Sequence, residues 1–344
     1  MKKQSKLLAL LLACAMTLAL SACGGSSATT STPAGSAAPA ASGSAAATGD
    51  KTYTIGICQL VQHNALDAAT KGFKDALTEK LGDKVKFDEQ NAAGDSAACT
   101  TICNQFVSSK VDLIMANATP ALQAATAATN SIPILGTSVT DYGTALSIAD
   151  WKGTTGTNVT GTADLAPLDK QAEMIKTLFP DKKNVGILYC SAEPNSKYQS
   201  TEITKYLTDA GYTCKEYTFA DSNDVAAVTK TACDESDVLY VPTDNTAASC
   251  AESINNIAEP AKVPIVAGES GICTGCGVAT LSIDYYDLGV VTGNMAYEVL
   301  VNGADPATTE IQFAPKTTYQ YMADRCEKLG VKVPSDYVAI EAEK

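Results

Sequence analysis

The sequence predicts an α/β protein built from two doubly wound, Rossmann-like lobes. From residue 52 onward, short apolar runs rich in β-branched residues alternate with longer stretches whose apolar residues recur at helical spacing. This alternation favours parallel sheets covered by helices. It begins again after a polar stretch near residues 157–161, which indicates two similar halves. A chain of 344 residues is also long enough for two hydrophobic cores.

The first strand, loop and helix mark the edge of the sheet where we expect a ligand. Residues 54–58 form an apolar strand, and from Leu66 the apolar side chains follow a helical period. The loop between them, residues 59–64, leaves the carboxyl end of the strand. Ligands bind at that edge in open α/β sheets, so this loop is a candidate wall of a site.

The later elements are predicted from the same periodicities. In the first half we expect strands over 85–90, 111–116 and 132–136, and helices over 96–110 and 120–130. In the second half we expect helices over 168–178, 195–210, 225–233 and 246–258, and strands over 184–189, 213–218, 238–241 and 263–266. One more amphipathic helix is expected over residues 285–302.

The first 50 residues are predicted to lie outside the folded body. Three lysines precede an apolar run over residues 7–20, which is typical of a signal peptide, here residues 1–22. The ending Leu-Ser-Ala-Cys23 resembles a bacterial lipobox, so Cys23 is the expected lipidation site. An ordinary secretory signal or an uncleaved anchor helix is the alternative. Residues 23–50 are almost entirely Gly, Ser, Ala, Thr and Pro and predict a flexible tether.

Composition argues against several kinds of function. The 25 basic residues are outnumbered by 38 acidic ones, which gives a net charge of −13, and no basic cluster stands out. We therefore expect no nucleic-acid partner. His63 is the single histidine, so the usual His-rich zinc sites are excluded. We expect no metal site and no cofactor.

Two of the twelve cysteines lie in the first 23 residues, which leaves ten in the body. An even number in an exported chain is compatible with disulfides. Several, such as Cys58 and Cys190, fall within apolar strand patterns, so we favour buried free thiols. Cys99 and Cys103 could face one another on a predicted helix, and residues 273–276 form an isolated C-x-x-C pair. We expect neither pair to be catalytic or metal-binding.

Polar side chains gather in the loops that follow the predicted strands. They are hydroxyls, amides and carboxylates, and predicted helix starts lie close behind them. Such a set suits a small polar or zwitterionic ligand, because helix-start N–H groups bind a carboxylate. Glu193, Asp244 or Asp141 would then bind an ammonium group. Helix capping is the alternative role for Thr119, Asn195 and Asp244.

No motif for catalysis stands out. The G-x-S-x-G elbow, the Walker loop, G-x-G-x-x-G and H-E-x-x-H are absent. A lone loop histidine such as His63 is more typical of a solvated or hydrogen-bonded residue than of a catalyst. We therefore expect a binding protein with no catalytic residues, not an enzyme.

Seven segments of the body resemble a known family, in order along the chain. They are IGICQLVQHNALDAATKGFKDAL, VDLIMANATPALQAA, SVTDYGTAL, NVTGTAD, VGILYCSAEPNS, YVPTDN and IDYYDLG. Across about residues 52–335 the chain resembles the bacterial ABC-transporter substrate-binding lipoproteins of the tryptophan/tyrosine-binding (TrpX-like) group. The resemblance implies a type I periplasmic-binding-protein fold, in which two lobes joined by three crossover strands close on a ligand.

The resemblance also implies lobe boundaries and site residues. Crossings near 157–161, 281–285 and 312–316 would give an N-terminal lobe of residues 51–158 and 285–313 and a C-terminal lobe of residues 159–284 and 314–344. The N-terminal lobe would line the ligand cleft with Gln59, Thr119, Thr137, Ser138 and Asp141. The C-terminal lobe would contribute Glu193, Asn195, Ser196, Asp244, Asn245 and Glu269.

By the same resemblance, the protein would be a monomeric receptor at the extracytoplasmic face of the membrane. It would capture a small molecule, such as an aromatic or other amino acid, by hinge closure and deliver it to an ABC permease. Two departures fall in site loops, because Asn64 and Tyr142 stand where the family usually has proline. The ligand preference of individual members therefore need not transfer. A sensory module for a signalling partner and a receptor for a sugar or nucleoside are the alternatives.

Overall fold

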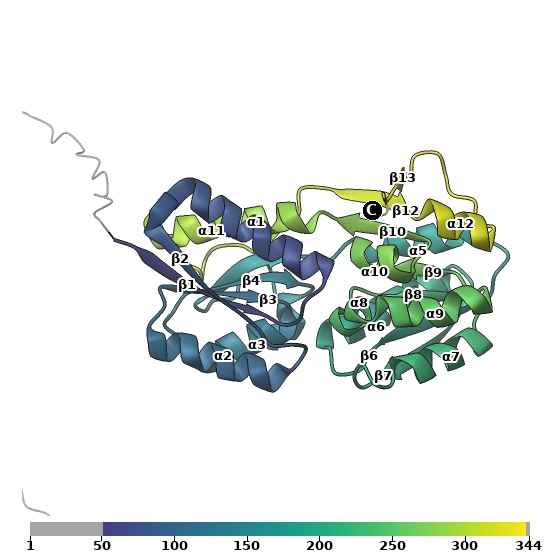
Figure 1. The fold of residues 1–344 in the computed structure, drawn as a ribbon, viewed down its shortest axis with the longest axis horizontal. Coiled ribbons are helices and arrows are strands. Elements are labelled where there is room, and N and C mark those ends of the chain that lie inside the picture. The colour runs from purple at the N-terminus through teal and green to yellow at the C-terminus, as the bar shows by residue number, and fades with distance from the viewer. Residues whose placement is uncertain (1–50, 342–344) are drawn as a thin grey trace, which may run out of the picture. The chain divides into compact units, whose positions relative to one another are not determined.

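The computed structural model describes residues 51–341, so the predicted signal peptide, Cys23 and the tether lie outside the described residues. Two sheets organise the described chain, each with helices on both faces (Figure 1). Strand pairing within them is parallel except at one antiparallel pair. The predicted fold class, two doubly wound α/β lobes, is confirmed.

The first sheet forms the centre of the N-terminal lobe. Its strands are β1 (Tyr53–Gln59), β2 (Val85–Asn91), β3 (Leu113–Asn117), β4 (Ile134–Val139), β5 (Val159–Ala163) and β11 (Gln312–Phe313). They lie in the order β11-β5-β4-β3-β1-β2. The helices of this lobe are α1 (Asn64–Leu81), α2 (Ser96–Ser109), α3 (Thr119–Ala128), α4 (Tyr142–Leu146) and α11 (Tyr285–Val301), with the 3-10 turn η1 (Gly82–Lys84).

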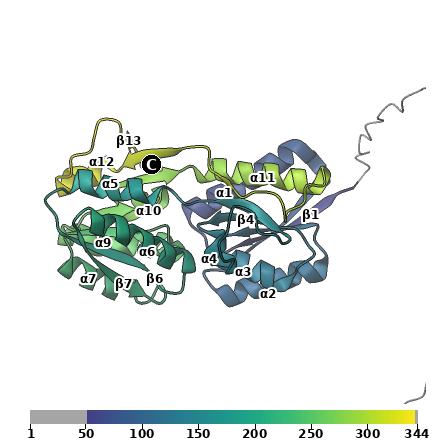
Figure 2. The same ribbon diagram turned by 180° about the vertical axis from the view of Figure 1, so that it is seen from behind.

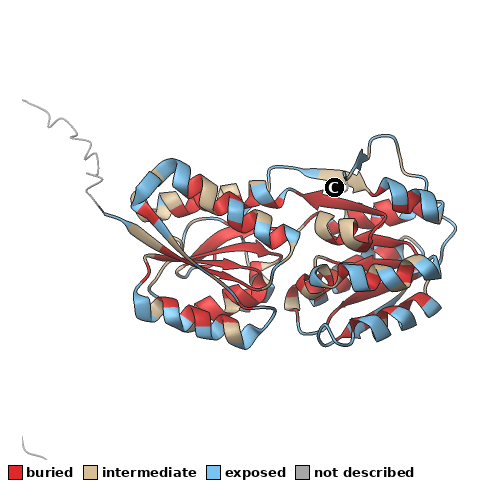
Figure 3. Ribbon diagram, viewed as in Figure 1, coloured by how far each residue is buried: buried red, intermediate tan, exposed pale blue. Residues whose placement is uncertain are grey.

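Side chains of opposite direction on the strands build two cores in this lobe. Ile55 and Ile57 pack with Phe73 of α1 and Met295 of α11 on one face. Cys58, the next residue after Ile57, packs on the other face with residues of α2 and α3. This alternation is the period of a strand that is buried on both sides. Figure 3 shows the result, with buried strands between helices whose outer faces are exposed.

The second sheet forms the centre of the C-terminal lobe. Its strands are β6 (Asn184–Cys190), β7 (Thr213–Phe219), β8 (Val238–Val241), β9 (Ile265–Ala267), β10 (Ala279–Ile283), β12 (Thr317–Tyr321) and β13 (Val338–Ala339). They lie in the order β13-β12-β10-β9-β8-β6-β7, with β12 antiparallel to β10. Its helices are α5 (Leu168–Leu178), α6 (Pro194–Asp209), α7 (Val225–Glu235), α8 (Asn245–Ser249), α9 (Ala251–Ala261), α10 (Ser270–Cys276) and α12 (Ala323–Leu329).

The chain passes between the two sheets three times. The passages follow β5 at residues 164–167, β10 at Asp284, and β11 at residues 314–316. The predicted first boundary, between residues 158 and 159, falls one strand too early, because β5 pairs in register with β4. Its short sequence, Val-Thr-Gly-Thr-Ala, has too few apolar residues to stand out as a buried strand.

Most predicted helices match those of the structure within a few residues, and one is divided. The helix expected over residues 246–258 is two helices, α8 and α9, which meet at Cys250. The structure adds two short helices where the sequence has loop-like composition, α4 and the glycine-containing α10. Both begin with an acidic residue whose side chain caps the helix, so local capping explains them where periodicity could not.

Helices α1 and α11 pack against each other through glycine. A methyl group added to Gly289 would lie 2.1 Å from the carbonyl oxygen of Ala69, and one added to Gly72 would lie 2.1 Å from that of Tyr286. A methyl group added to Gly293 would lie 2.7 Å from the carbonyl oxygen of Phe73. The absence of side chains at these positions lets the two backbones touch. The pairing joins helices that are about 200 residues apart in the sequence, as Figure 1 shows.

All ten body cysteines are free thiols in the structure. Eight of them are buried, and Cys58, Cys99 and Cys103 belong to one apolar core. Burial raises the pKa of Cys276 to about 12 and that of Cys233 to about 11, so these thiols are poor nucleophiles.

Within residues 51–341, no helix is both long and apolar enough to cross a membrane.

Candidate functional site

The carboxyl ends of the strands of the two sheets face each other, and the loops there contain the predicted site residues. His63 at the start of α1 reaches across, with its Nε2 atom 3.3 Å from Oδ1 of Asn245 at the start of α8. Helix α4 of the N-terminal lobe also contacts α6 of the C-terminal lobe, as seen from behind in Figure 2. The strand ends therefore meet along a common line, as expected for a site between lobes.

Two pockets open along this line. One, of about 160 Å³, is lined by Val61 and Pro120 from the N-terminal lobe and by Glu193 and Asn245 from the C-terminal lobe. The other, of about 390 Å³, is lined by His63 together with residues of α9 and α10. Their positions on either side of the His63 and Asn245 contact show that the lobes already touch at this point.

In the C-terminal lobe, Glu193 is engaged by its own lobe. Its Oε1 accepts hydrogen bonds from the backbone N–H and the hydroxyl of Thr246, both at 2.8 Å. Its Oε2 accepts from the backbone N–H (3.1 Å) and side-chain amide (2.6 Å) of Asn245 and from Asn195. The side chain is 4% exposed. Glu193 thus holds the start of α8 in place, and neither oxygen is left for a ligand.

Asp244 is saturated in the same way. Its Oδ2 accepts hydrogen bonds from the backbone N–H of Cys190 and the hydroxyl of Ser196, both at 2.7 Å, and its Oδ1 caps α8 through Ala247 N–H. Burial, together with the nearby charge of Glu193, raises the pKa of Asp244 to about 8. Five predicted site residues, Glu193, Asn195, Ser196, Asp244 and Asn245, are therefore brought together as one buried hydrogen-bond network.

Glu269 caps α10 from the end of β9. Its carboxylate accepts hydrogen bonds from the backbone N–H groups of Gly271, at 2.6 Å, and Ile272. Burial raises its pKa to about 7. The other end of α10 is held by Arg325 of α12, whose guanidinium donates to the carbonyl oxygens of Cys273, Thr274, Gly275 and Gly277. The carboxyl-terminal segment of the chain thus fixes a helix that begins at the site.

In the N-terminal lobe, two predicted site residues are also bonded within the lobe. The side-chain amide nitrogen of Gln59 donates to Asp67 at 2.6 Å, and its carbonyl oxygen accepts from Thr70 at 2.7 Å. The hydroxyl of Thr137 lies 3.1 Å from those of Thr162 and Thr292, beneath the sheet edge. Both residues position the strand ends and do not present free polar atoms.

The start of α3 and the end of β4, in contrast, have polar groups that are not bonded within the lobe. Helix α3 has no side-chain cap, and the residue before it, Ala118, has a φ of 92°. Ser138 has a φ of 53°, and its hydroxyl is buried with no hydrogen-bond partner within residues 51–341. Left-handed φ values at residues other than glycine cost energy and cluster at ligand sites. The Ala118 N–H donates to Thr137 at 3.0 Å, so these two strained residues lie on adjacent strands beside Thr119.

Buried polar atoms without partners mark the region between the lobes. Among the described residues, the unpartnered atoms at the facing strand ends are His63 Nδ1, Asn117 Oδ1, Ser138 Oγ, Asp164 Oδ1 and Asn195 Oδ1. Native proteins pair nearly all such groups, and a cluster of exceptions at one place indicates a binding partner. The cluster contains a hydroxyl donor, Ser138, and several acceptors, among them Asn195 Oδ1 of the C-terminal lobe, as a small zwitterion would require.

The sequence alone did not reveal Asp164. It follows β5 directly, and its backbone N–H donates to Val139 O of the neighbouring β4 at 3.2 Å. Tyr285, the first residue of α11, donates its hydroxyl to Asp164 Oδ2 at 3.0 Å. A correct assignment of β5 would have placed Asp164 at the ligand edge of the sheet.

Asp141 is peripheral to this cluster. Its Oδ1 caps α4 by accepting from Thr144 N–H at 2.6 Å. The pKa of Tyr198 on α6 is raised, first by the burial of its hydroxyl and second by the charge of Asp141. The two residues therefore lie near each other across the lobes. Asp141 therefore stands at the rim, where α4 and α6 meet.

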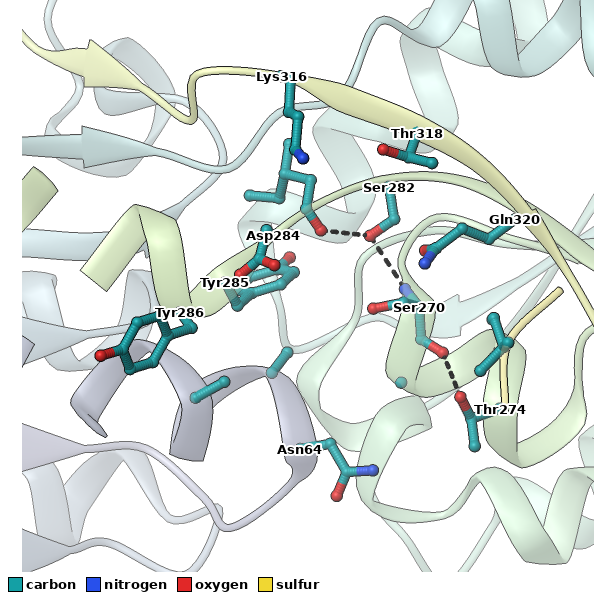
Figure 4. A pocket seen from close by; sticks show the side chains of 15 residues that line it. Asn64, Ser270, Thr274, Ser282, Asp284, Tyr285, Tyr286, Lys316, Thr318 and Gln320 are labelled. Atoms are coloured by element: carbon teal, nitrogen blue, oxygen red, sulfur yellow. Dashed lines mark hydrogen bonds between the residues drawn. The ribbon is translucent and has the colours of Figure 1, made fainter. Parts of the chain in front are cut away.

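A further pocket, of about 390 Å³, lies beside the crossovers between the lobes. Figure 4 shows its polar side chains, among them Ser270, Ser282 and Lys316, around the start of α11. Ser282 receives a hydrogen bond from Ser270 N–H at 3.1 Å and donates to Ile283 O at 2.9 Å. None of the unpartnered atoms of the interlobe cluster belongs to this pocket.

Within residues 51–341, no group of three or more metal-ligating side chains is placed to hold a metal ion.

Known proteins resemble this chain over its whole body. Residues 54–344 match the family model described as ABC transporter substrate binding protein. A tyrosine-binding protein of Clostridioides difficile is 40% identical over 265 residues, which are 75% of this chain and 76% of that protein. An ABC domain from Streptococcus pneumoniae, solved in complex with L-Trp, is 34% identical with a TM-score of 0.81, covering 84% of this chain and all of that one.

A third relative bears on the arrangement of the lobes. The ligand-free, open structure of a substrate-binding protein with adhesive properties from Clostridium difficile is 36% identical, covers 85% of this chain and all of that one, and has a TM-score of 0.65. Although its identity is slightly higher than that of the L-Trp complex, it superposes less well. The described arrangement is thus closer to the ligand-bound relative. The matched family model and these relatives together show that the chain belongs to the family of ABC transporter substrate-binding proteins.

Proposed function

We propose that this protein is the extracytoplasmic receptor of an ABC importer and that its ligand is an aromatic amino acid. Two relatives support this choice, the tyrosine-binding protein and the ABC domain solved with L-Trp. The observation that carries it is the cluster of unpartnered buried polar atoms between the lobes. A small zwitterion between the strand ends would satisfy those atoms from both sides.

The start of α3 is the proposed subsite for the carboxylate of the ligand. The helix spans ten residues and lacks a side-chain cap, so the N–H groups of Thr119 and Ala121 can bind an anion, while Pro120 between them has no N–H. The buried hydroxyl of Ser138 on the adjacent strand adds a donor. We propose Thr119 and Ser138 as ligand contacts. Thr137 and Gln59, which are hydrogen-bonded within the lobe, would hold the strand ends in position.

The C-terminal lobe would close over the ligand as a rigid body. Glu193 and Asp244 fix the start of α8 and Glu269 that of α10, so that Asn195 and Asn245 form a preformed surface, with Ser196 bonded to Asp244 behind them. Ligand contacts with both lobes favour the closed state, which a permease can distinguish from the open one. The family is one of binding proteins, and we propose capture and release without chemical turnover.

The remaining features of the proposal concern the setting of the protein. We propose that Cys23 carries the lipid anchor, that residues 23–50 tether the body to the membrane, and that the body acts as a monomer. The partners would be the small-molecule ligand and the permease subunits. A sensory role, or a sugar or nucleoside as ligand, is the competing proposal, and the ligand experiment below separates the substrate classes.

Thermal unfolding of residues 51–344 in the presence of single candidate ligands tests the proposal. A ligand at 100 times its dissociation constant adds about 2.7 kcal/mol to the free energy of unfolding. We expect L-Trp, L-Tyr or L-Phe to raise the midpoint and sugars and nucleosides to leave it unchanged. A shift with a sugar or nucleoside alone would reject the amino-acid ligand while keeping the receptor.

Substituting Ser138 tests the carboxylate subsite. Ser138→Ala should weaken amino-acid binding about tenfold, because one hydrogen bond to the ligand is worth about 1.5 kcal/mol. It should not lower the stability of the unliganded protein, because the hydroxyl has no partner among residues 51–341. Ser147→Ala is a matched control, since Ser147 has a φ of 54° but is exposed. Equal calorimetric affinities for the two variants would remove Ser138 from the site.

A further inference from the structure

We infer that Asp164 binds the ammonium group of the ligand, with Tyr285 orienting its carboxylate. This inference rests on the proposed amino-acid ligand and adds a binding residue that the sequence did not indicate. Asp164 is 3% exposed, and its Oδ1 has no hydrogen-bond partner among residues 51–341. A buried carboxylate oxygen without a donor is costly, so its retention points to a cationic partner.

The other buried carboxylates near the strand ends are already occupied. Both oxygens of Glu193 and both of Asp244 accept hydrogen bonds from their own lobe. Glu269 accepts from two backbone N–H groups of α10. Asp164 is the one carboxylate among the described residues whose oxygen is buried and unpartnered. By elimination, Asp164 is the one buried carboxylate of the described interlobe region with an oxygen free for an ammonium group, since Asp141 is only half-buried at the rim.

The position of Asp164 suits an α-amino acid. Strands β3, β4 and β5 are neighbours in the sheet. Thr119 follows β3 by two residues, Ser138 is the last but one residue of β4, and Asp164 follows β5 directly. Adjacent parallel strands lie about 4.8 Å apart. A ligand whose carboxylate binds at α3 and Ser138 would therefore place a neighbouring ammonium group near the end of β5.

The surroundings of Asp164 favour a cation over a neutral donor. Tyr285 donates to Oδ2 from the start of α11, and Thr140 and Tyr142 lie nearby on the segment after β4. From the C-terminal lobe, Glu269 is close enough for the charge of Asp164 to contribute to its raised pKa. Burial raises the pKa of Asp164 itself to about 6, against the lowering effect of the Tyr285 and Thr140 hydroxyls. Two buried acids that lie close together favour a positive charge between them.

A two-by-two comparison of ligand and protein tests this assignment. L-Tyr and its deaminated analogue, 3-(4-hydroxyphenyl)propionate, are titrated calorimetrically into the wild type and Asp164→Asn, and L-Trp and indole-3-propionate serve as a second pair. The wild type should bind the amino acid roughly 100-fold more tightly than the deaminated analogue, because a charge-assisted bond to a buried carboxylate is lost. Asp164→Asn should bind the two compounds within about threefold of each other. Asp181→Asn, an exposed acid on the surface of the C-terminal lobe, should behave as the wild type.

The pH dependence of the wild type provides a second readout that needs no variant. The ionised form of Asp164 binds the ammonium, so L-Tyr affinity should be full above pH 7. It should then fall about tenfold per pH unit as the pH drops below about 6. The deaminated analogue should lack this loss between pH 7 and pH 5.5.

Three results would overturn the assignment. Unchanged L-Tyr affinity in Asp164→Asn would show that the carboxylate does not bind the ammonium. An equal loss for L-Tyr and its deaminated analogue would show a structural role only. If the wild type binds none of the aromatic amino acids, the proposed function fails first, and the ammonium subsite fails with it.

Discussion

Replacing Glu193 with alanine is expected to lower the free energy of unfolding by roughly 3–5 kcal/mol. The substitution leaves five donors without their acceptor, namely the N–H groups and side chains of Asn245 and Thr246 and the amide of Asn195. These groups are largely buried, so water replaces the carboxylate poorly. Removing the Glu193 charge also removes its repulsion of the Asp244 carboxylate, which offsets part of the loss of stability.

Chemical denaturation of Glu193→Ala measures the effect, with Glu252→Ala as the control. Glu252 lies in the first turn of α9 and is exposed, so its loss should change stability by less than about 0.5 kcal/mol. We also expect weaker ligand binding in Glu193→Ala, because Asn245, which contacts His63 across the lobes, loses its support. A variant as stable as the wild type would mean that the network is not structural.

Gly289→Ala should destabilise the protein by about 3 kcal/mol or more, because the new methyl group would overlap the backbone of α1. Its position, 2.1 Å from the Ala69 carbonyl oxygen, is far inside van der Waals contact, and a backbone atom cannot swing aside. The helices would have to separate, which would also disturb the core where Phe73 and Met295 meet.

Asn294→Ala is the matched control for this helix. Asn294 lies on the exposed face of α11, where alanine should be neutral or slightly stabilising through its higher helix propensity. Thermal unfolding of the two variants compares them directly. A midpoint for Gly289→Ala within about 2 °C of that of Asn294→Ala would show that the helix contact can relax.

The sequence predicts most of this fold because its elements carry strong periodic signals. Strands such as β3 and β8 are short apolar runs, and α1 and α11 have continuous apolar faces. Three of the elements that it misses are stabilised by something other than periodicity. Strand β5 is polar in composition but buried by its neighbours, and α4 and α10 are single-turn or two-turn helices held by acidic caps.

The candidate site was predictable as a region but not residue by residue. Loop composition places Thr119, Ser138, Glu193 and Asp244 at the facing strand ends, and the structure puts them there. Sequence cannot distinguish a carboxylate that is saturated by backbone N–H groups from one that is free. That difference depends on the tertiary neighbours of each oxygen, which is why the sequence predicts Glu193 as a ligand contact and does not predict Asp164.

The order in which the lobes are completed affects how such a chain can fold as it is synthesised. Helix α11 is needed to cover the first sheet, and β12 and α12 are needed to finish the second, although all three come after residue 284. No amino-terminal fragment shorter than this contains a whole lobe. A growing chain therefore cannot complete either lobe until its last sixth, the part after residue 284, has been synthesised.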